Sequence, residues 1–311
     1  MALRQKNGGA RFKREAAIIV WSAFVPRHMR QYLRQLYRLI YPKLYGRHDL
    51  KLIFNATIRD LNERARLLLA ATDFFQGVVR SIPISAPFGE SVLVIAPHQD
   101  DEAIGCGGAI AAQVAAGKRA VIVLLQDGAG GHEELGMTRI QMSELRNRES
   151  TAAAISGGLP VPYFLNHPDL SAASFAIVGE LVALIQEHHA DAIFSPFPLD
   201  AHPDHRTAAA LLAEALRQIS WPVRVLTYEV WGLCIANVVL PIDHVIDNKR
   251  RMLESFVWAN KALDYTNSTL GLNMFRSRQL PPGTCRYAEC FFELPKADYI
   301  EFMDRMKQSS H

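Results

Sequence analysis

Two short segments about a hundred residues apart carry side chains suited to metal chemistry. Residues 96–102 read A-P-H-Q-D-D-E, and residues 200–205 read D-A-H-P-D-H. Together they offer imidazole nitrogens and carboxylate oxygens, which zinc accepts as ligands in proteins, and they leave further carboxylates for proton transfer. The pattern indicates a metal-dependent hydrolase.

Three of these side chains can form a ligand set for one metal ion. His98 and Asp101 are three residues apart on one turn and can point the same way, and His205 can complete the set from the second segment. Three protein ligands leave coordination positions for water and substrate, which distinguishes catalytic from structural zinc sites. We therefore expect His98, Asp101 and His205 to bind zinc.

The other polar side chains of the two segments suit proton transfer. Asp100 lies beside the expected ligands without being one, and we expect it to act as general base toward the attacking water. His202, as an imidazolium, would stabilise the oxyanion and protonate the leaving amine. Asp204 would orient a histidine through its second ring nitrogen. The alternative is that Asp101 and Asp204 cap helices.

Strands and helices are predicted to alternate around the two segments. Apolar runs rich in β-branched residues predict strands, and the segments between them predict helices. This alternation predicts an α/β fold, a Rossmann-like, doubly wound and mostly parallel sheet. Because both motif segments follow a predicted strand end, we expect them to meet at the carboxyl edge of the sheet. The predicted strands are 91–96, 120–125, 161–165, 192–195 and 223–230, and the predicted helices are 109–116, 137–156, 174–189 and 206–219.

A glycine-rich stretch, G-C-G-G at 105–108, follows the first motif. It lacks the dinucleotide-binding pattern G-x-G-x-x-G, because Ile110 stands at the last glycine position. We expect these glycines to permit a sharp turn and close packing of a helix on the sheet.

The composition limits the classes to which this protein can belong. A chain of 311 residues with 49% hydrophobic and 21% charged residues can bury a sizeable core. Its four cysteines form no C-x-x-C pair, which argues against a disulfide framework or a thiolate zinc site. We expect a cytoplasmic protein.

Basic residues gather near the N-terminus. The first fifty residues carry a net charge of +9, and the remainder carries −6. An apolar run at 16–25 is shorter than the ~20 residues that span a bilayer. It also follows Glu15 directly and precedes no small-x-small cleavage site, which disfavours a secretion signal. We expect residues 1–87 to be a basic, largely helical extension and 88–311 the catalytic domain.

Residues 27–45 predict a cationic amphipathic helix, with Arg27, Arg30, Arg34 and Arg38 on one side. Such a helix suits peripheral contact with an anionic membrane surface. The alternative is an ordinary surface helix that packs on the domain. Since no base-reading motif accompanies the charge, we expect no nucleic-acid partner, and the sequence makes no prediction about the oligomeric state.

The order A-P-H-x-D-D-E after a first strand, followed by H-P-D-H after a later one, resembles the PIG-L/LmbE-like zinc-dependent N-acetylglucosamine de-N-acetylases. The resemblance covers roughly residues 90–295. It implies a Rossmann-like fold and the same ligands, base and acid as the chemistry indicates. It also implies that the substrate is an N-acetylated amino sugar in a glycoconjugate.

The same resemblance implies two substrate contacts. Arg146, within R-N-R-E, matches an arginine that approaches substrate, and Asp169, within N-H-P-D, matches an aspartate that binds sugar hydroxyls. The alternatives are a solvated or helix-paired arginine and a turn aspartate. The chain departs from the family at Gln99, where proline is usual, and this changes loop stiffness without removing a ligand or the base.

Two other functions remain open at this point. One is metal-dependent hydrolysis of a different amide or ester. The other is a noncatalytic glycan-binding or membrane-recruited scaffold. A binding protein would not need the carboxylate of Asp100, which favours catalysis.

Overall fold

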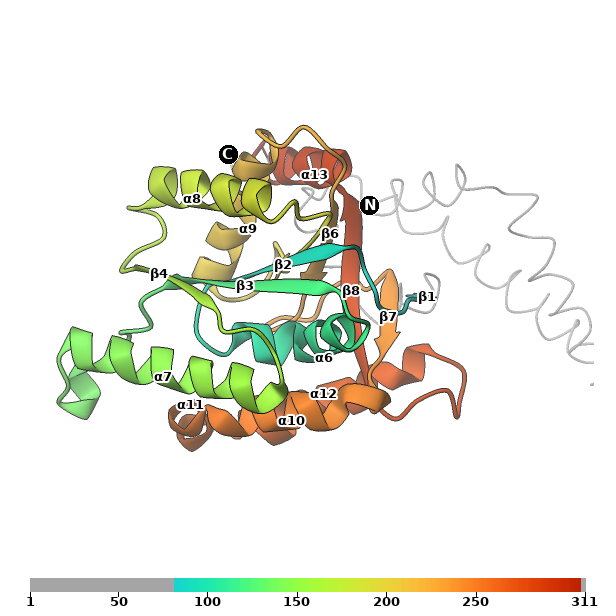
Figure 1. Ribbon diagram of the computed structural model, residues 1–311, viewed down its shortest axis with the longest axis horizontal. Helices are drawn as coiled ribbons and strands as arrows, with labels where there is room; N and C mark the ends of the chain where they lie inside the picture. Colours follow the sequence, from blue (N-terminus) through green and yellow to red (C-terminus); the bar gives the residue numbers. More distant parts are fainter. Residues whose placement is uncertain (1–80, 309–311) are drawn as a thin grey trace, which may run out of the picture. The chain divides into compact units, whose positions relative to one another are not determined.

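A mixed sheet organises the part of the chain that the computed structural model describes, residues 81–308 (Figure 1). Within these residues the sheet has eight strands in the order β1-β7-β8-β6-β5-β2-β3-β4. The strands are β1 (Ile82–Pro83), β2 (Ser91–Ala96), β3 (Arg119–Gln126), β4 (Tyr163–His167), β5 (Ala192–Pro196), β6 (Arg224–Tyr228), β7 (Val238–Pro241) and β8 (Ala288–Pro295).

Five neighbouring strands, from β6 through β5, β2 and β3 to β4, run parallel, whereas β8 pairs antiparallel with both β6 and β7. The strand order reverses between β2 and β5, which is where open α/β sheets bind ligands. All six residues of β2 are buried, as expected for a strand covered on both faces. The predicted Rossmann-like, mostly parallel sheet is confirmed.

Helices cover both faces of the sheet. On one face lie α6, α7 and α10 to α12, and on the other lie α8, α9 and α13 (Figure 1). The helices are α6 (Asp101–Ala115), α7 (Arg139–Gly157), α8 (Ser174–Glu187), α9 (Pro203–Leu216), α10 (Ile246–Ser255), α11 (Val257–Ala262), α12 (Tyr265–Arg276) and α13 (Lys296–Gln308), with 3-10 turns at Glu133–Leu135, Asp243–Val245 and Ser277–Gln279.

Helix α6 begins earlier than the sequence predicts, because the acidic residues of the first motif form its first turn. The helix is kinked at Cys106, whose φ of −144° is not helical. Beside the kink, a Cβ on Gly105 would lie 2.0 Å from the ring of Tyr228. The glycine-rich stretch therefore allows close packing, as predicted.

Part of the segment before β2 joins the sheet. Ile82–Pro83 forms β1 parallel to β7, and the Ile84 N–H donates to the Val239 carbonyl at 2.9 Å. A two-residue edge strand beside prolines has no periodicity for a sequence pattern to detect. The amphipathic segment 27–45 lies outside the described residues. Among the described helices, none has the length and apolarity needed to cross a bilayer.

Candidate metal and catalytic site

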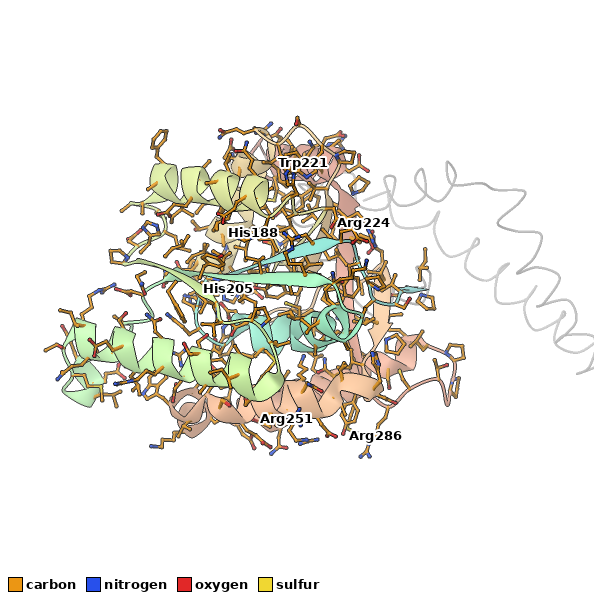
Figure 2. All side chains as sticks on the ribbon, in the orientation of Figure 1. His188, His205, Trp221, Arg224, Arg251 and Arg286 are labelled. Carbon is orange, nitrogen blue, oxygen red and sulfur yellow. The ribbon has the colours of Figure 1, made fainter. Side chains whose placement is uncertain are left out.

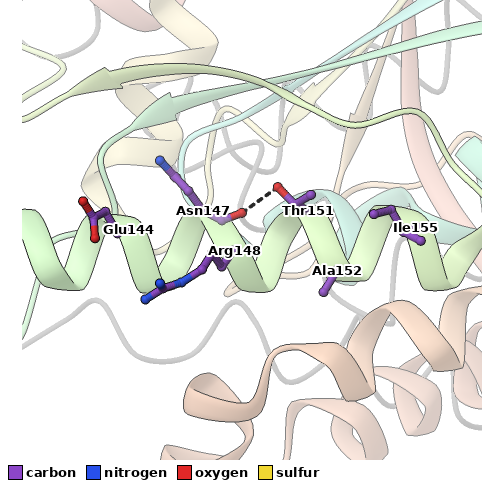
Figure 3. A pocket seen from close by; sticks show the side chains of 6 residues that line it. All are labelled: Glu144, Asn147, Arg148, Thr151, Ala152 and Ile155. Atoms are coloured by element: carbon purple, nitrogen blue, oxygen red, sulfur yellow. Dashed lines mark hydrogen bonds between the residues drawn. The ribbon is translucent and has the colours of Figure 1, made fainter.

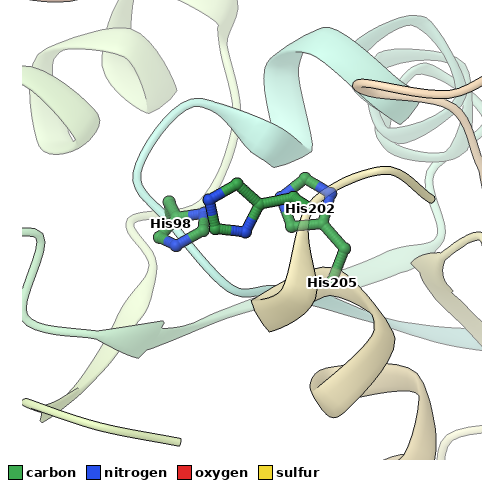
Figure 4. Close-up of side chains that lie close together, drawn as sticks. All are labelled: His98, His202 and His205. Carbon is green, nitrogen blue, oxygen red and sulfur yellow. The ribbon is translucent and has the colours of Figure 1, made fainter.

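Three histidines from two distant segments meet at the switch point of the sheet (Figure 4). His98 follows β2, while His202 and His205 lie at the start of α9, after β5. One ring nitrogen from each lies within 4.8 Å of the others. Figure 2 shows His205 in the interior, whereas the labelled Arg251 lies at the periphery. The fold thus brings together histidines that are far apart in the sequence.

Asp101 lies between two of these histidines. Its Oδ2 is 3.1 Å from His98 Nδ1 and 3.2 Å from His205 Nε2. Ligand atoms bound to one zinc at about 2.0–2.1 Å in a tetrahedron lie about 3.3 Å from one another. Both distances from Asp101 Oδ2 are therefore close to those between two ligands of a single ion.

His205 provides the test of whether a metal fits. The side chain is completely buried, and neither ring nitrogen makes a well-aligned hydrogen bond within the described structure. Nevertheless, Nε2 lies close to Asp101, and Nδ1 lies 3.1 Å from Asp200 Oδ1. A buried polar nitrogen without a partner is costly, and a cation between Nε2 and Asp101 would satisfy both. The donor set therefore fits a metal ion.

A second carboxylate contacts the other nitrogen of His98. Asp204 Oδ2 lies 3.1 Å from His98 Nε2, and the same oxygen accepts a hydrogen bond from Gln126 Nε2 at 2.9 Å. Histidines that bind metals usually hold a carboxylate or carbonyl at the second nitrogen. The structure thus places Asp204 and Gln126 where they fix the ring of His98.

The electrostatics of the cluster favour a bound cation. Burial opposes the charged forms, but Asp101 and Asp204 raise the pKa of His98 to about 9. Likewise, Asp101 and Asp200 raise the pKa of His205 to about 10 against burial. Both histidines in turn hold the pKa of Asp101 far below its usual range, although burial acts to raise it. Without metal, protons on the imidazoles neutralise the carboxylates, and a divalent cation would displace them.

Asp100 stands apart from the ligand cluster although it adjoins Asp101. Its backbone has a φ of 129°, a conformation that costs a non-glycine residue about 1–3 kcal/mol. Its Oδ2 accepts a hydrogen bond from Arg146 Nη2 at 3.0 Å. Burial raises the pKa of Asp100 to about 6, while Arg146 opposes this rise. A pKa near the operating pH suits a general base.

The structure places Arg146 behind Asp100. The guanidinium is 5% exposed, donates to the Gln99 carbonyl as well as to Asp100, and lies 5.1 Å from the ring centre of Trp258. Its Nη1 is buried without a hydrogen-bond partner among the described residues. These contacts make Arg146 a positioning residue for Asp100, and its contact with substrate stays a prediction.

His202 makes a contact that assigns its proton. As the N-cap of α9, its Nδ1 accepts the N–H of Asp204 at 3.2 Å. A neutral imidazole has one acceptor nitrogen, so Nε2 then carries the hydrogen and is a donor rather than a ligand. Burial, with the positive charges of His98 and His205, lowers the pKa of His202. The structure therefore favours a neutral donor, in contrast to the imidazolium expected from the sequence.

Asp169 lies in an exposed turn after β4. Its Oδ1 accepts the N–H groups of Ser171 and Ala172, each at 2.8 Å. In the described structure these hydrogen bonds stay within the turn, which corresponds to the alternative stated for this residue. Its contact with sugar hydroxyls stays a prediction.

Asp200 is a site residue to which the sequence assigned no role. It is 1% exposed, its Oδ1 faces His205, and its Oδ2 accepts the N–H groups of Trp231 and Gly232, both at 3.0 Å. Its position at the start of the second motif was the available signal. No sequence signal marked Gln126, at the end of β3, as a site residue.

Gln99 stands where the family usually has proline, and hydrogen bonds hold its side chain in place. Its buried Nε2 donates to the Gln126 carbonyl at 3.1 Å and to Asn147 Oδ1 at 2.8 Å. A Cβ at Gly128 would lie 2.2 Å from Gln99 Oε1, so the neighbouring loop needs a glycine there. These bonds tie the first motif to β3 and α7.

A separate hollow lies along α7 (Figure 3). No histidine is among the described residues that line it, so the chemistry lies at the histidine cluster instead. The lining residues are Glu144, Asn147, Arg148, Thr151, Ala152 and Ile155.

Residues 93–216 match the family described as PIG-L, GlcNAc-PI de-N-acetylase. This segment is similar to a PIG-L domain and makes up less than half of the chain. This domain includes both motif segments and every strand from β2 to β5 except the first two residues of β2.

A sequence relative and two solved structures resemble this chain. Diacetylchitobiose deacetylase of Thermococcus kodakarensis is 29% identical over 163 residues, covering 50% of this chain and 58% of the relative's length. The N,N'-diacetylchitobiose deacetylase of Pyrococcus horikoshii aligns with TM-score 0.56 and 22% identity over 68% of this chain and 85% of that one. The 4-carboxy-2-hydroxymuconate hydratase GalB of Pseudomonas putida aligns with TM-score 0.56 and 20% identity over 66% and 96%.

At these identities the two solved structures share only the fold with this chain. The chain matches little more than half the length of the curated relative. Since one neighbour is a deacetylase and another a hydratase, the reaction must be argued from the site.

Proposed function

We propose that this chain is a zinc-dependent hydrolase that removes the N-acetyl group from an N-acetylated amino sugar in a glycoconjugate. The observation that carries the proposal is the separation of two adjacent carboxylates. Asp101 lies between two histidine nitrogens at ligand spacing, whereas Asp100 turns to Arg146 with a raised pKa. One carboxylate thus suits metal binding and the other proton transfer.

The sugar substrate is supported by the comparisons. The matched family is described as a GlcNAc-PI de-N-acetylase, and the sequence relative is a diacetylchitobiose deacetylase. Hydrolysis of another amide or ester uses the same groups and is the second candidate. A noncatalytic scaffold is disfavoured, because a buried aspartate held at positive φ has no evident use in a binding protein.

His98, Asp101 and His205 would hold the zinc ion. When bound, zinc would polarise the acetyl carbonyl and make a water molecule more acidic. Asp200 and Asp204 would keep the two histidines oriented through their second nitrogens.

Asp100 would accept the proton of the water whose oxygen attacks the acetyl carbon. His202, with Nδ1 occupied by the Asp204 N–H, would donate Nε2–H to the developing oxyanion. As the carbon–nitrogen bond breaks, Asp100 would return the proton to the amine nitrogen, so that acetate and a free amino sugar leave. This route does not need a charged His202, in keeping with its lowered pKa.

Membrane contact through 27–45 and a cytoplasmic location stay predictions. Flotation of the full-length protein with anionic vesicles tests the former. A form starting at Phe88 serves as the comparison for loss of binding.

Release of acetate and amine from N-acetylglucosamine conjugates tests the proposed activity. We expect turnover by the zinc-loaded protein, loss after chelation, and recovery when zinc is restored. Full activity in metal-free protein would contradict the zinc assignment. Preferential turnover of acetyl esters would favour the second candidate, and sugar binding without turnover would favour the scaffold.

A further inference from the structure

An exposed tryptophan is tied directly to the metal-site candidate. Trp231 lies three residues beyond the end of β6, at the same carboxyl edge of the sheet as the histidines. The backbone N–H of Trp231 donates to Asp200 Oδ2, and Asp200 Oδ1 faces His205. A Cβ on Gly232 would lie 3.4 Å from the Asp200 Cα, so this loop packs closely against the second motif.

The Trp231 side chain remains 48% exposed despite this anchored backbone. Its ring packs edge-on against Tyr265, with ring centres 5.8 Å apart and planes at 82°. Burying the free surface of such a ring against a ligand would be favourable, because it removes apolar surface from water. The anchored backbone also means that little order would have to be gained on binding.

The charges of the candidate site act on Tyr265. Burial raises the pKa of Tyr265 to about 12, and the negative charges of Asp100 and Asp101 contribute to the rise. The guanidinium of Arg146, which donates to Asp100, lies 5.1 Å from the ring centre of Trp258. Trp231 in the loop after β6 and Trp258 in α11 therefore each adjoin a residue that contacts the candidate site.

We propose that Trp231 and Tyr265 form a stacking platform that binds the pyranose ring of the substrate while its acetamide group enters the metal site. The proposal rests on the proposed function, since it names the part of an amino-sugar substrate that the aromatic pair holds. Trp231 supplies the exposed ring face, and Tyr265 supports it edge-on.

The chemistry of a sugar ring fits this surface. The axial C–H bonds of a pyranose form an apolar, slightly positive face, which suits the negative face of an indole. The hydroxyl groups at the ring edge remain available for polar side chains and water. Few precisely placed polar groups beside an aromatic surface are typical of small-molecule sites. A simple acyl chain would use the apolar area but gain nothing from the ring geometry.

Kinetics and binding of the β-1,4-linked dimer of N-acetylglucosamine test the platform. We expect Trp231→Ala to raise KM roughly five- to tenfold, with kcat within about twofold. Trp231→Phe, which keeps a ring face, should recover most of the loss. The matched control is Phe175→Ala on α8, across the sheet, which removes a side chain that is 94% exposed and should change neither constant.

A binding titration separates this proposal from the proposed function. In zinc-loaded Asp100→Asn protein, which blocks turnover, the dimer should bind several-fold more weakly when Trp231→Ala is added. If the sugar binds in a Trp231-dependent way but wild-type protein never hydrolyses it, the platform stands and the deacetylase proposal fails. Hydrolysis with an unchanged KM in Trp231→Ala, or a loss confined to kcat, would overturn the platform alone. Neither binding nor hydrolysis would overturn both.

Discussion

Two sets of buried charges, both in contact with helix α6, differ in how the protein satisfies them. Lys249 and Glu289 are at most 1% exposed and pair with each other at 2.5 Å. Lys249 Nζ also donates to the Ile104 carbonyl, and Glu289 accepts the N–H groups of Gly108 and Ala109, each at 2.8 Å. Every charge in this set therefore has protein partners.

The charges at the start of α6 lack such a complete set of partners. His205 is fully buried and makes no well-aligned hydrogen bond among the described residues. One carboxylate oxygen of Asp101 lies close to the imidazoles of both His98 and His205. The first set stabilises the kinked helix against β8 and α10. In the second set, the ring nitrogens of His205 remain available to coordinate a cation. Burial of charge alone does not mark a functional site. The second set differs because its imidazoles and carboxylates lie at ligand spacing without well-aligned hydrogen bonds at His205.

Removing the base should produce the largest change in rate. Asp100→Asn keeps the shape of the side chain but cannot accept a proton, so kcat/KM should fall about 10²- to 10⁴-fold. Steady-state deacetylation measures this loss. Asp304→Asn, which also disrupts an aspartate–arginine pair but on the outer surface, is the control and should stay within about twofold. A similar rate in Asp100→Asn and wild type would remove Asp100 as the base.

Breaking the satisfied charge set should affect stability instead. Lys249→Met leaves Glu289 buried without its cation, and we expect a loss of about 3–5 kcal/mol in the free energy of unfolding. Urea denaturation gives this value, with the exposed Lys261→Met as control. Folded protein should still bind metal. If stability changed by less than about 1 kcal/mol while activity disappeared, Lys249 would belong to the site and the contrast would be wrong.

A smaller loss is expected from the hydrogen bonds of Gln99. Gln99→Leu leaves the Gln126 carbonyl and Asn147 without this donor, which should cost about 1–3 kcal/mol in the free energy of unfolding. Thermal or urea unfolding measures the change. Gln99→Pro restores the usual family residue and shows whether the ring can replace the hydrogen bonds. An unchanged stability in Gln99→Leu would mean that the bonds contribute nothing.

The subtlest prediction concerns the pH profile. Ionised Asp100 is the active form of the base, so kcat/KM should rise with pH through the pKa of Asp100. Arg146 lowers that pKa, and Arg146→Gln should therefore move the rising limb to higher pH by about one unit. The exposed neighbour Arg148→Gln should leave the limb in place. A limb that moves to lower pH would contradict the assignment.

Part of the fold and of the candidate site could be anticipated from the sequence, where local patterns determine the structure. The run at 91–96 predicted β2 with its bounds, and the place of the two motifs after strand ends predicted that His98 and His205 would meet. Both inferences depend on periodicity and on the geometry of parallel sheets. The C-terminal strands β7 and β8 were missed, because their antiparallel pairing joins residues far apart in the chain.

Partners chosen by tertiary packing were beyond sequence reasoning. Nothing local marks Gln126 as the donor to Asp204, or Trp231 as the neighbour of Asp200. The protonation of His202 depends on a contact of the same kind. Its Nδ1 is occupied by the backbone at the start of α9, and that contact depends on where the helix begins.

Zinc content and activity of two adjacent variants test the central claim most directly. We compare Asp100→Asn with Asp101→Asn after zinc loading and desalting, and measure metal per protein beside deacetylation. Both variants should be inactive, but only Asp101→Asn should lose its zinc, because Asp101 alone of the two lies at ligand distance from His98 and His205. Equal zinc content in the two variants would contradict the division of these carboxylates into ligand and base.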